Sequence, residues 1–162
     1  MMPTWVRSLI GIPFVERGRG LQGGDCWNVV QLGLKKGWGI EVPSYTEDYV
    51  TTVDREEIAQ LVARESLGWM PVPLAQARPG DVLFLRIQGN ECHAGLIIEP
   101  PWFLHGIRGA CSCLERWDAA IWEKRISAVY RHPQLQEPAL AQASTMAQMS
   151  VEKRSYHPSL RS

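Results

Sequence analysis

The stretch Gly23–Lys36, GGDCWNVVQLGLKK, decides the fold because it predicts a helix that begins with a cysteine. Asp25 is a good N-cap residue, so the helix is expected to begin at Cys26 or Trp27. Apolar residues then recur at helical spacing on more than one face, which is typical of a largely buried helix. Two lysines and Gly37 favour the C-terminal end of the helix there.

Downstream of this helix the hydrophobic period changes from that of a helix to two, the period of strands. Residues 78–81, Arg-Pro-Gly-Asp, predict a turn. A second helix is expected from Asp54 to Gly68, because Asp54 and Glu57 have the spacing of a capping box. Strands are expected over 82–87, 93–99, 102–107 and 127–131. Helices followed by a run of antiparallel strands predict an α+β fold.

Length and composition indicate one folded domain. The chain has 162 residues, 45% of them hydrophobic, which suffices for a buried core. We expect the domain to span 1–132, and 133–162 to form a flexible C-terminal tail, because that segment is rich in Ala, Gln and Ser and ends polar and basic.

Charge and hydropathy exclude several classes of partner. The 17 basic and 17 acidic residues give a formal net charge of zero, which argues against a nucleic-acid binder. No apolar run approaches the roughly 20 residues that span a bilayer. Residues 1–14 are too short and broken to be a signal peptide, so we expect synthesis in the cytoplasm without export by that route.

Cys26 is the first candidate for chemistry. A thiol in the first turn of a helix lies beside backbone N–H groups and the positive end of the helix dipole. This environment lowers a cysteine pKa and stabilises the thiolate, and the same N–H groups can hold an oxyanion. The alternative is that Cys26 is simply a small buried residue after a glycine-rich loop.

His93 and His105 are the second candidate. If 93–99 and 101–107 form a hairpin with a three-residue loop, His105 lies opposite His93 or opposite Gly95, and both histidines share one face. An even-length loop would put them on opposite faces. One imidazole could then take the proton of a thiol while the second fixes its tautomer. Two unrelated, half-exposed histidines are the alternative.

Three blocks of sequence, in this order and spacing, carry a resemblance to a known family. They are residues 10–27, which run from Ile-Gly-Ile-Pro-Phe through glycines to Asp-Cys-Trp, then 78–83, Arg-Pro-Gly-Asp-Val-Leu, and 93–106, from His-Ala-Gly-Leu to His-Gly. Over about 7–131 the chain resembles the NlpC-type papain-like cysteine peptidases that cut peptidoglycan peptides, especially their bacteriophage tail-associated branch.

The resemblance implies a fold and a set of roles. The fold would be a helix carrying the cysteine, packed on a small antiparallel sheet or barrel carrying the histidines. Cys26 matches the nucleophile, His93 the general base and His105 the residue that orients it. The resemblance implies cleavage of amide bonds in peptidoglycan stem peptides through an acyl-enzyme, with no metal or organic cofactor. Other phage tail proteins are the implied partners, and a virion tail is the implied location.

Four further residues are expected to contact substrate. Phe14 stands where the family usually has a Tyr near the active site. Asp25 and Trp27 flank the matched nucleophile, and Trp102 lies between the two histidines in sequence. A second departure is Asn28, which replaces the Gly of the common Asp-Cys-x-Gly pattern. Both departures concern substrate preference and rate.

Two other interpretations stay open. Cys92, His93, Cys111 and Cys113, with His105 nearby, could supply zinc ligands, although a Cys-x-Cys spacing is too short for the common structural form. The second alternative is a non-catalytic structural or binding module of a phage tail that keeps the fold.

Overall fold

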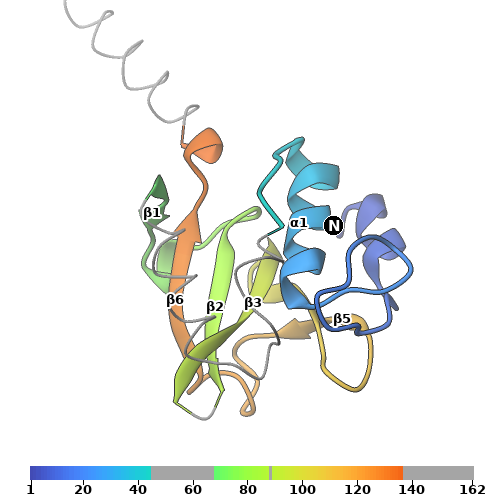
Figure 1. The fold of residues 1–162 in the computed structure, drawn as a ribbon. Helices are drawn as coiled ribbons and strands as arrows, with labels where there is room; N and C mark the ends of the chain where they lie inside the picture. Colours follow the sequence, from blue (N-terminus) through green and yellow to red (C-terminus); the bar gives the residue numbers. More distant parts are fainter. Residues whose placement is uncertain (45–67, 88, 137–162) are drawn as a thin grey trace, which may run out of the picture.

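A single helix packed on a single sheet forms the centre of the computed structural model, which describes residues 1–44, 68–87 and 89–136 (Figure 1). Helix α1 spans Cys26–Trp38. Six strands pair antiparallel in the order β1-β6-β2-β3-β4-β5. The α+β prediction, with the cysteine helix on an antiparallel sheet, is therefore confirmed. The strands are β1 (Met70–Pro71), β2 (Val82–Ile87), β3 (Asn90–Glu99), β4 (Trp102–Gly106), β5 (Ser112–Arg116) and β6 (Ile126–Arg131).

Three short 3₁₀ helices complete the described elements: η1 (Thr4–Leu9), η3 (Leu74–Gln76) and η4 (Pro133–Leu135). Leu135 of η4 packs against the core, and its carbonyl accepts a hydrogen bond of 2.7 Å from Arg78 Nη2. The predicted second helix from Asp54 lies outside the described residues, and so does all of the predicted tail 133–162 except 133–136, which contain η4. Among the described residues, no helix has the length and hydropathy to cross a membrane.

Helix α1 begins where the sequence predicts and ends two residues later. Its N-cap is Asp25, whose Oδ1 accepts a hydrogen bond of 3.0 Å from the backbone N–H of Asn28. Gly37 lies inside the helix, where its missing side chain leaves room for Trp5; an added Cβ would lie 2.6 Å from Cζ2 of that indole. Gly39 ends the helix instead, because it adopts the left-handed conformation with φ 68° and donates its N–H to the last turn.

The sheet separates two apolar clusters. The first lies between α1 and the sheet, and its close packing depends on Gly33, where an added Cβ would lie 2.2 Å from Leu96 Cδ2. Its members on α1, β2, β3 and β4 are Val29, Val30, Leu34, Val82, Phe84, Ala94, Leu96, Ile98 and Leu104. The second covers the opposite face and contains Val72, Leu83, Leu85, Ile97, Phe103, Trp117, Trp122 and Val129. Alternate residues of β2, β3 and β4 thus serve two different cores.

Four strands agree with the sequence prediction to within a few residues, and two were missed. Strand β3 begins at Asn90, three residues before the predicted start at His93. Strand β5 was not predicted. It is held by Ser112, whose backbone N–H donates to Ile12 O and whose Oγ donates to Leu9 O. These contacts come from the N-terminal segment, about 100 residues away in sequence, so local pattern could not reveal them.

A bulge sets the register of the β3–β4 hairpin. Leu96 pairs with Leu104, but Glu99 pairs with Trp102, so one extra residue of β3 is accommodated between them. The turn itself has two residues, 100 and 101. An even turn alone would put the two histidines on opposite faces, and the bulge restores the parity. Continued one residue from the Leu96–Leu104 pair, the register sets His105 opposite Gly95.

The predicted Pro-Gly turn leads into a buried ion pair. Gly80 has φ 92°, and the Asp81 N–H bonds Arg78 O, as the turn prediction requires. The Asp81 carboxylate accepts two hydrogen bonds of 2.7 Å from Arg131, one from Nε and one from Nη2. A bidentate pair of this kind joins the start of β2 to the end of β6. The aspartate of this motif is therefore structural.

Candidate active site

The two histidines of the β3–β4 hairpin are in direct contact. His93 Nε2 lies 2.8 Å from His105 Nδ1, and the rings meet edge to face at 76°. His105 is fully buried, and His93 is nearly so. The hairpin therefore places both rings on one face of the sheet. This face is opposite to the one that packs against α1.

Glu115 on β5 extends this contact into a chain of three. Its Oε2 lies 2.8 Å from His105 Nε2 and also accepts a hydrogen bond of 2.8 Å from Trp122 Nε1. Because an indole can only donate, this carboxylate oxygen acts as an acceptor for both neighbours. The sequence alone indicates no role at the site for Glu115 or Trp122. The available sequence signal for Glu115 was its spacing of two from Cys113 and four from Cys111. This spacing places all three residues on one face if the segment forms a strand.

The Glu115 carboxylate determines which nitrogens carry protons. It accepts from His105 Nε2–H, which leaves His105 Nδ1 without a proton and able to accept from His93 Nε2–H. His93 Nδ1 then carries a lone pair. This is the tautomer that a general base needs if the thiol proton arrives at Nδ1.

Burial keeps both rings uncharged at neutral pH. Burial first, and then the neighbouring His105, lowers the pKa of His93 to about 3. Burial lowers the pKa of His105 to about 4. Trp122 contributes to this shielding, since its ring stacks on His93 at 5.9 Å with an interplanar angle of 13°. In this neutral state each imidazole has one ring nitrogen that carries a proton and one that carries a lone pair.

Cys26 is the first residue of α1 and is buried. The helix packs on β3 and β4, the two strands that carry the histidines (Figure 1). One close approach is at the end of β4, where a Cβ added to Gly106 would lie 3.4 Å from Asp25 O. The backbone next to His105 therefore lies against the backbone next to Cys26. The thiol has the helix-terminal environment that stabilises a thiolate.

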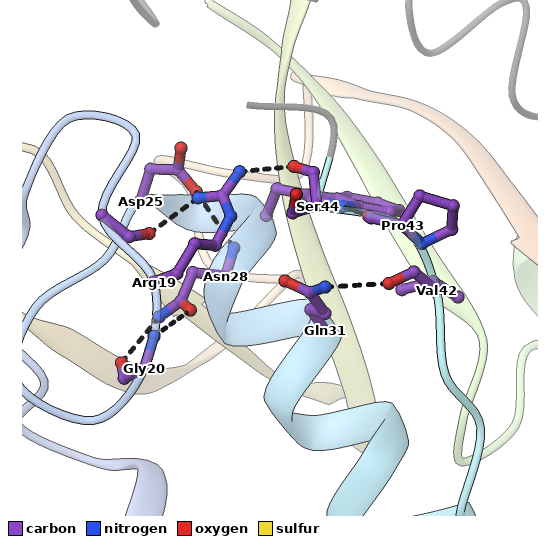
Figure 2. A network of polar contacts seen from close by, with 10 residues as sticks. Arg19, Gly20, Asp25, Asn28, Gln31, Val42, Pro43 and Ser44 are labelled. Atoms are coloured by element: carbon purple, nitrogen blue, oxygen red, sulfur yellow. Dashed lines mark hydrogen bonds and ion pairs between the residues drawn. The ribbon is translucent and has the colours of Figure 1, made fainter. Parts of the chain in front are cut away.

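The glycine-rich loop before Cys26 is fixed by two side chains (Figure 2). Arg19 donates from Nη1 to Asp25 Oδ1 at 2.8 Å, so the N-cap carboxylate is also an ion-pair partner. Asn28 forms a reciprocal pair with Gly20, accepting from its N–H at 2.8 Å and donating to its carbonyl at 3.0 Å. The amide that replaces the family's glycine thus holds the loop to the helix.

The segment after α1 returns along the same helix (Figure 2). Gln31 Nε2 donates to Val42 O, and Trp27 Nε1 donates to Pro43 O, both at 2.8 Å. The Trp27 indole is therefore half-buried and hydrogen-bonded beside the start of the helix. The Asp25 carboxylate is fully buried, so its visible role is structural. Contact of either residue with substrate stays a prediction.

The other two predicted substrate residues lie apart from each other. Phe14 is half-buried beside the glycine loop, where its backbone pairs with Gly24 and the Arg108 guanidinium lies 5.2 Å from its ring centroid. Trp102 is 37% exposed at the start of β4, and Arg116 lies 5.6 Å from its ring. Phe14 shares the loop that precedes Cys26, whereas Trp102 and His105 lie at opposite ends of one strand.

The remaining described cysteines differ from Cys26. Burial first, then Glu115 and Cys111, raises the pKa of the Cys113 thiol to about 11, so it is protonated at neutral pH. Cys111 is exposed. The zinc set considered from sequence is not assembled among the described side chains; there, the group with metal-ligating geometry is His105, Cys113 and Glu115. The side chain of Cys92 lies outside the described residues.

Comparison with solved structures gives the same fold at low sequence identity. An NLP/P60 family lipoprotein-like protein from Staphylococcus aureus matches with a TM-score of 0.53 and 18% identity, over 76% of this chain and 37% of that one. A Bacillus cereus NlpC/P60 protein gives 0.56 and 17%, over 82% and 41%. This chain thus spans less than half of either relative. The NlpC/P60 domain of the peptidoglycan hydrolase SagA gives 0.52 and 20%, over 76% and 90%.

A search of curated proteins finds no relative of this chain. The model of the NlpC/P60 family matches residues 11–131, which is most of the chain and contains Cys26, both histidines and Glu115. The same residues form the helix, the sheet and the histidine contact described above. The chain therefore belongs to the NlpC/P60 family of cysteine peptidases.

Proposed function

We propose that the chain hydrolyses amide bonds in peptidoglycan stem peptides, with Cys26 as nucleophile and His93 as general base. The single observation that carries this proposal is the hydrogen-bonded chain from Glu115 through His105 to His93. It holds His93 in the tautomer whose Nδ1 can take a proton, and it does so on β3, a strand against which the cysteine-bearing helix α1 packs. The substrate class is supported by family membership and by the likeness to the NlpC/P60 domain of SagA, a peptidoglycan hydrolase.

The proposed reaction begins with transfer of the Cys26 thiol proton to His93 Nδ1. The thiolate attacks the amide carbonyl carbon, an S–C bond forms, and the carbonyl electron pair moves to oxygen. Backbone N–H groups of the first turn of α1, including that of Cys26, stabilise this oxyanion. Collapse breaks the C–N bond, and His93 Nδ1 returns its proton to the leaving amine.

Water then completes the reaction. His93 removes a proton from the water as it attacks the thioester carbonyl, the C–S bond breaks, and the thiolate leaves. The product is a carboxylic acid, and the proton on His93 returns to Cys26. His105 and Glu115 change no bonds to substrate; they act as positioning residues for His93 throughout both steps.

We further propose a setting in a bacteriophage tail, with other tail proteins as partners. This setting is supported by the sequence resemblance of residues 10–27, 78–83 and 93–106 to the tail-associated branch of the family. Mass spectrometry of virions grown from a host that carries the gene tests it. Peptides of this chain in purified particles support the setting, and their absence from particles that contain all other tail proteins contradicts it.

The activity test compares the wild type, Cys26→Ala and Cys111→Ala on purified sacculi, with released fragments identified by mass spectrometry. Cys111 is exposed, so its replacement controls for general loss of a thiol. Release by the wild type and Cys111→Ala, and not by Cys26→Ala, supports the proposal and names the bond that is cut. Release by all three contradicts the role of Cys26.

Thiol reactivity separates the enzyme from a non-catalytic module. Iodoacetamide at about pH 6 should label Cys26 first, because a helix-terminal thiolate reacts before ordinary thiols. Cys113 should lag, since its pKa is raised to about 11. Equal and slow labelling of all thiols, together with intact sacculi, would favour a structural tail module.

A further inference from the structure

We propose that His105, Cys113 and Glu115 form a binding site for a divalent transition metal, most favourably Zn²⁺, and that metal bound there switches off the general base. The three residues lie on one face of neighbouring strands, because His105 pairs directly with Cys113 and Phe103 pairs with Glu115. One ligand atom from each lies within 4.8 Å of the other two. The binding part of this proposal is independent of the proposed function, and the switching part rests on it.

The donor atoms suit zinc in type and position. Imidazole nitrogen, thiolate sulfur and carboxylate oxygen are its usual ligands, and three of them with one open position is a common arrangement. Tetrahedral bond lengths require about 3.3 Å between N and O and about 3.5 Å between N and S. The structure has 2.8 Å between His105 Nε2 and Glu115 Oε2, and 3.8 Å between His105 Nε2 and Cys113 Sγ. All three ligand atoms lie within 4.8 Å of one another, so side-chain shifts of up to about an ångström would seat the ion.

The site can be reached from solvent. His105 is fully buried, but the Glu115 side chain is 34% exposed and Cys113 is half-buried. Metal can therefore approach from the β5 side without opening the core. Trp122 Nε1 bonds Glu115 Oε2, and that oxygen keeps a second lone pair with which it can bind the ion. On binding, the thiol of Cys113 gives its proton to solvent, and the resulting thiolate and the Glu115 carboxylate balance the two charges of the ion.

Metal at His105 Nε2 would reverse the tautomers of both rings. The ligating nitrogen must be unprotonated, so the His105 proton moves to Nδ1 and is donated to His93 Nε2. His93 then holds its own proton on Nδ1, the atom proposed to accept the thiol proton of Cys26. Each ring keeps one proton and stays neutral, yet the base is blocked. Glu115 supports the active tautomer without metal and becomes a ligand with it.

Binding is tested on the full chain carrying Cys26→Ala, which removes the proposed nucleophile as a competing ligand. Co²⁺ serves as a spectroscopic probe, because a thiolate ligand gives a charge-transfer absorption, and Zn²⁺ affinity is measured against a chromophoric chelator. We expect one ion per chain. Cys113→Ser should remove the thiolate absorption and weaken Zn²⁺ binding at least about tenfold, the loss that even a supporting residue causes. The matched control is Cys111→Ser, which should change neither.

Two results would overturn the site: no ion bound by the Cys26→Ala chain, or a thiolate absorption that survives in Cys113→Ser. The tautomer switch has its own readout in long-range ¹⁵N–¹H NMR spectra of the histidine rings. Zn²⁺ should move the protonated nitrogen of His93 from Nε2 to Nδ1, and an unchanged His93 ring in the metal-bound chain would contradict the switch.

The effect on hydrolysis is measured last, in chains that keep Cys26. Zn²⁺ should inhibit the wild type and Cys111→Ser alike, and Cys113→Ser should need at least about tenfold more Zn²⁺. Equal inhibition of Cys113→Ser would mean that the ion acts at Cys26 and His93 instead, which refutes the switch. Metal binding with no hydrolysis in any variant would refute the proposed function and leave the site standing.

Discussion

The two faces of the β3–β4 hairpin are built from alternate residues of the same two strands, and they have different tasks. The face toward α1 carries Ala94, Leu96, Ile98 and Leu104, all apolar and buried. The opposite face carries the two histidines beside Phe103 and Ile97. Alternation in a strand lets one short segment stabilise the fold and hold the proposed catalytic groups without mixing the two.

The two faces differ in the substitutions that they tolerate. Apolar packing on the α1 face is non-directional, so it needs volume and shape. The histidine face needs defined donors and acceptors, because each buried ring nitrogen must find a partner with the right proton. A substitution on the first face should therefore cost stability, and one on the second should cost activity.

The largest effect is expected on the histidine face. His105→Ala removes the acceptor for His93 Nε2–H, so His93 loses its fixed tautomer. We expect kcat to fall about 10²- to 10⁴-fold, the usual contribution of a positioned acid–base group, with a much smaller rise in KM. Steady-state kinetics on a soluble stem peptide measure both. An unchanged kcat would remove His105 from the mechanism.

The matched change on the α1 face is Leu96→Ala, in a side chain that packs against Gly33. It removes a buried side chain and leaves a cavity, which should lower the free energy of unfolding by about 2–5 kcal/mol. Denaturant unfolding gives this value, and kcat of the folded protein should stay near that of the wild type. A large loss of kcat without loss of stability would show that the two faces are not separable.

A subtler change tests the end of the chain of hydrogen bonds. Glu115→Gln keeps an oxygen acceptor for His105 and Trp122 but removes the negative charge. We expect kcat to fall roughly 10- to 100-fold, as for other residues that support a functional histidine. Glu123→Gln, on a residue outside the network, is the control and should leave kcat unchanged. Equal rates for both variants would limit Glu115 to a structural role.

The smallest effect expected is the change in the free energy of unfolding with pH. His93 and His105 have pKa values of about 3 and 4 in the folded chain, below the ordinary value of 6.5. Between the folded pKa values and 6.5, the unfolded chain binds more protons than the folded chain. The stability from this source is therefore full above pH 6.5 and falls as the pH drops through 6 and 5. Burial also lowers the pKa of His132, which adds in the same direction.

We expect a loss of roughly 1 kcal/mol for the histidine pair between pH 7 and pH 6. Urea unfolding at a series of pH values measures it. His93→Gln should reduce the slope in this window. Stability that is flat from pH 7 to pH 5 would mean that the histidines titrate alike in both states, contrary to their burial.

Much of the fold could be predicted because its signals are local. The cap at Asp25, the helical spacing after it, the turn at 78–81 and the strand over 82–87 each depend on neighbours within a few residues. The sequence favours Gly37 as the end of the helix, whereas the structure ends it at Gly39. The two glycines differ only in the folded chain, where Trp5 packs against Gly37. Strand β5 stayed hidden because its anchors lie in residues 9–12.

The candidate site was predictable only in part. The sequence offered Cys26, His93 and His105, and it made the contact between the two histidines conditional on the parity of one loop. The structure has an even turn together with a bulge at Ile98, a combination that loop length alone does not predict. Glu115 could not be found without β5, because a carboxylate gains its role only when a neighbouring strand brings it to the ring.

By itself the sequence determined a cysteine at the start of a buried helix, a run of antiparallel strands and two histidines that one hairpin could bring together. These follow from capping, hydrophobic period and turn chemistry, which act between residues close in sequence. Tertiary structure decided the tautomers of those histidines, the partnership of Glu115 with Trp122 and the grouping of His105 with Cys113. These depend on hydrogen bonds between strands, whose directions are fixed only when register and bulge are set.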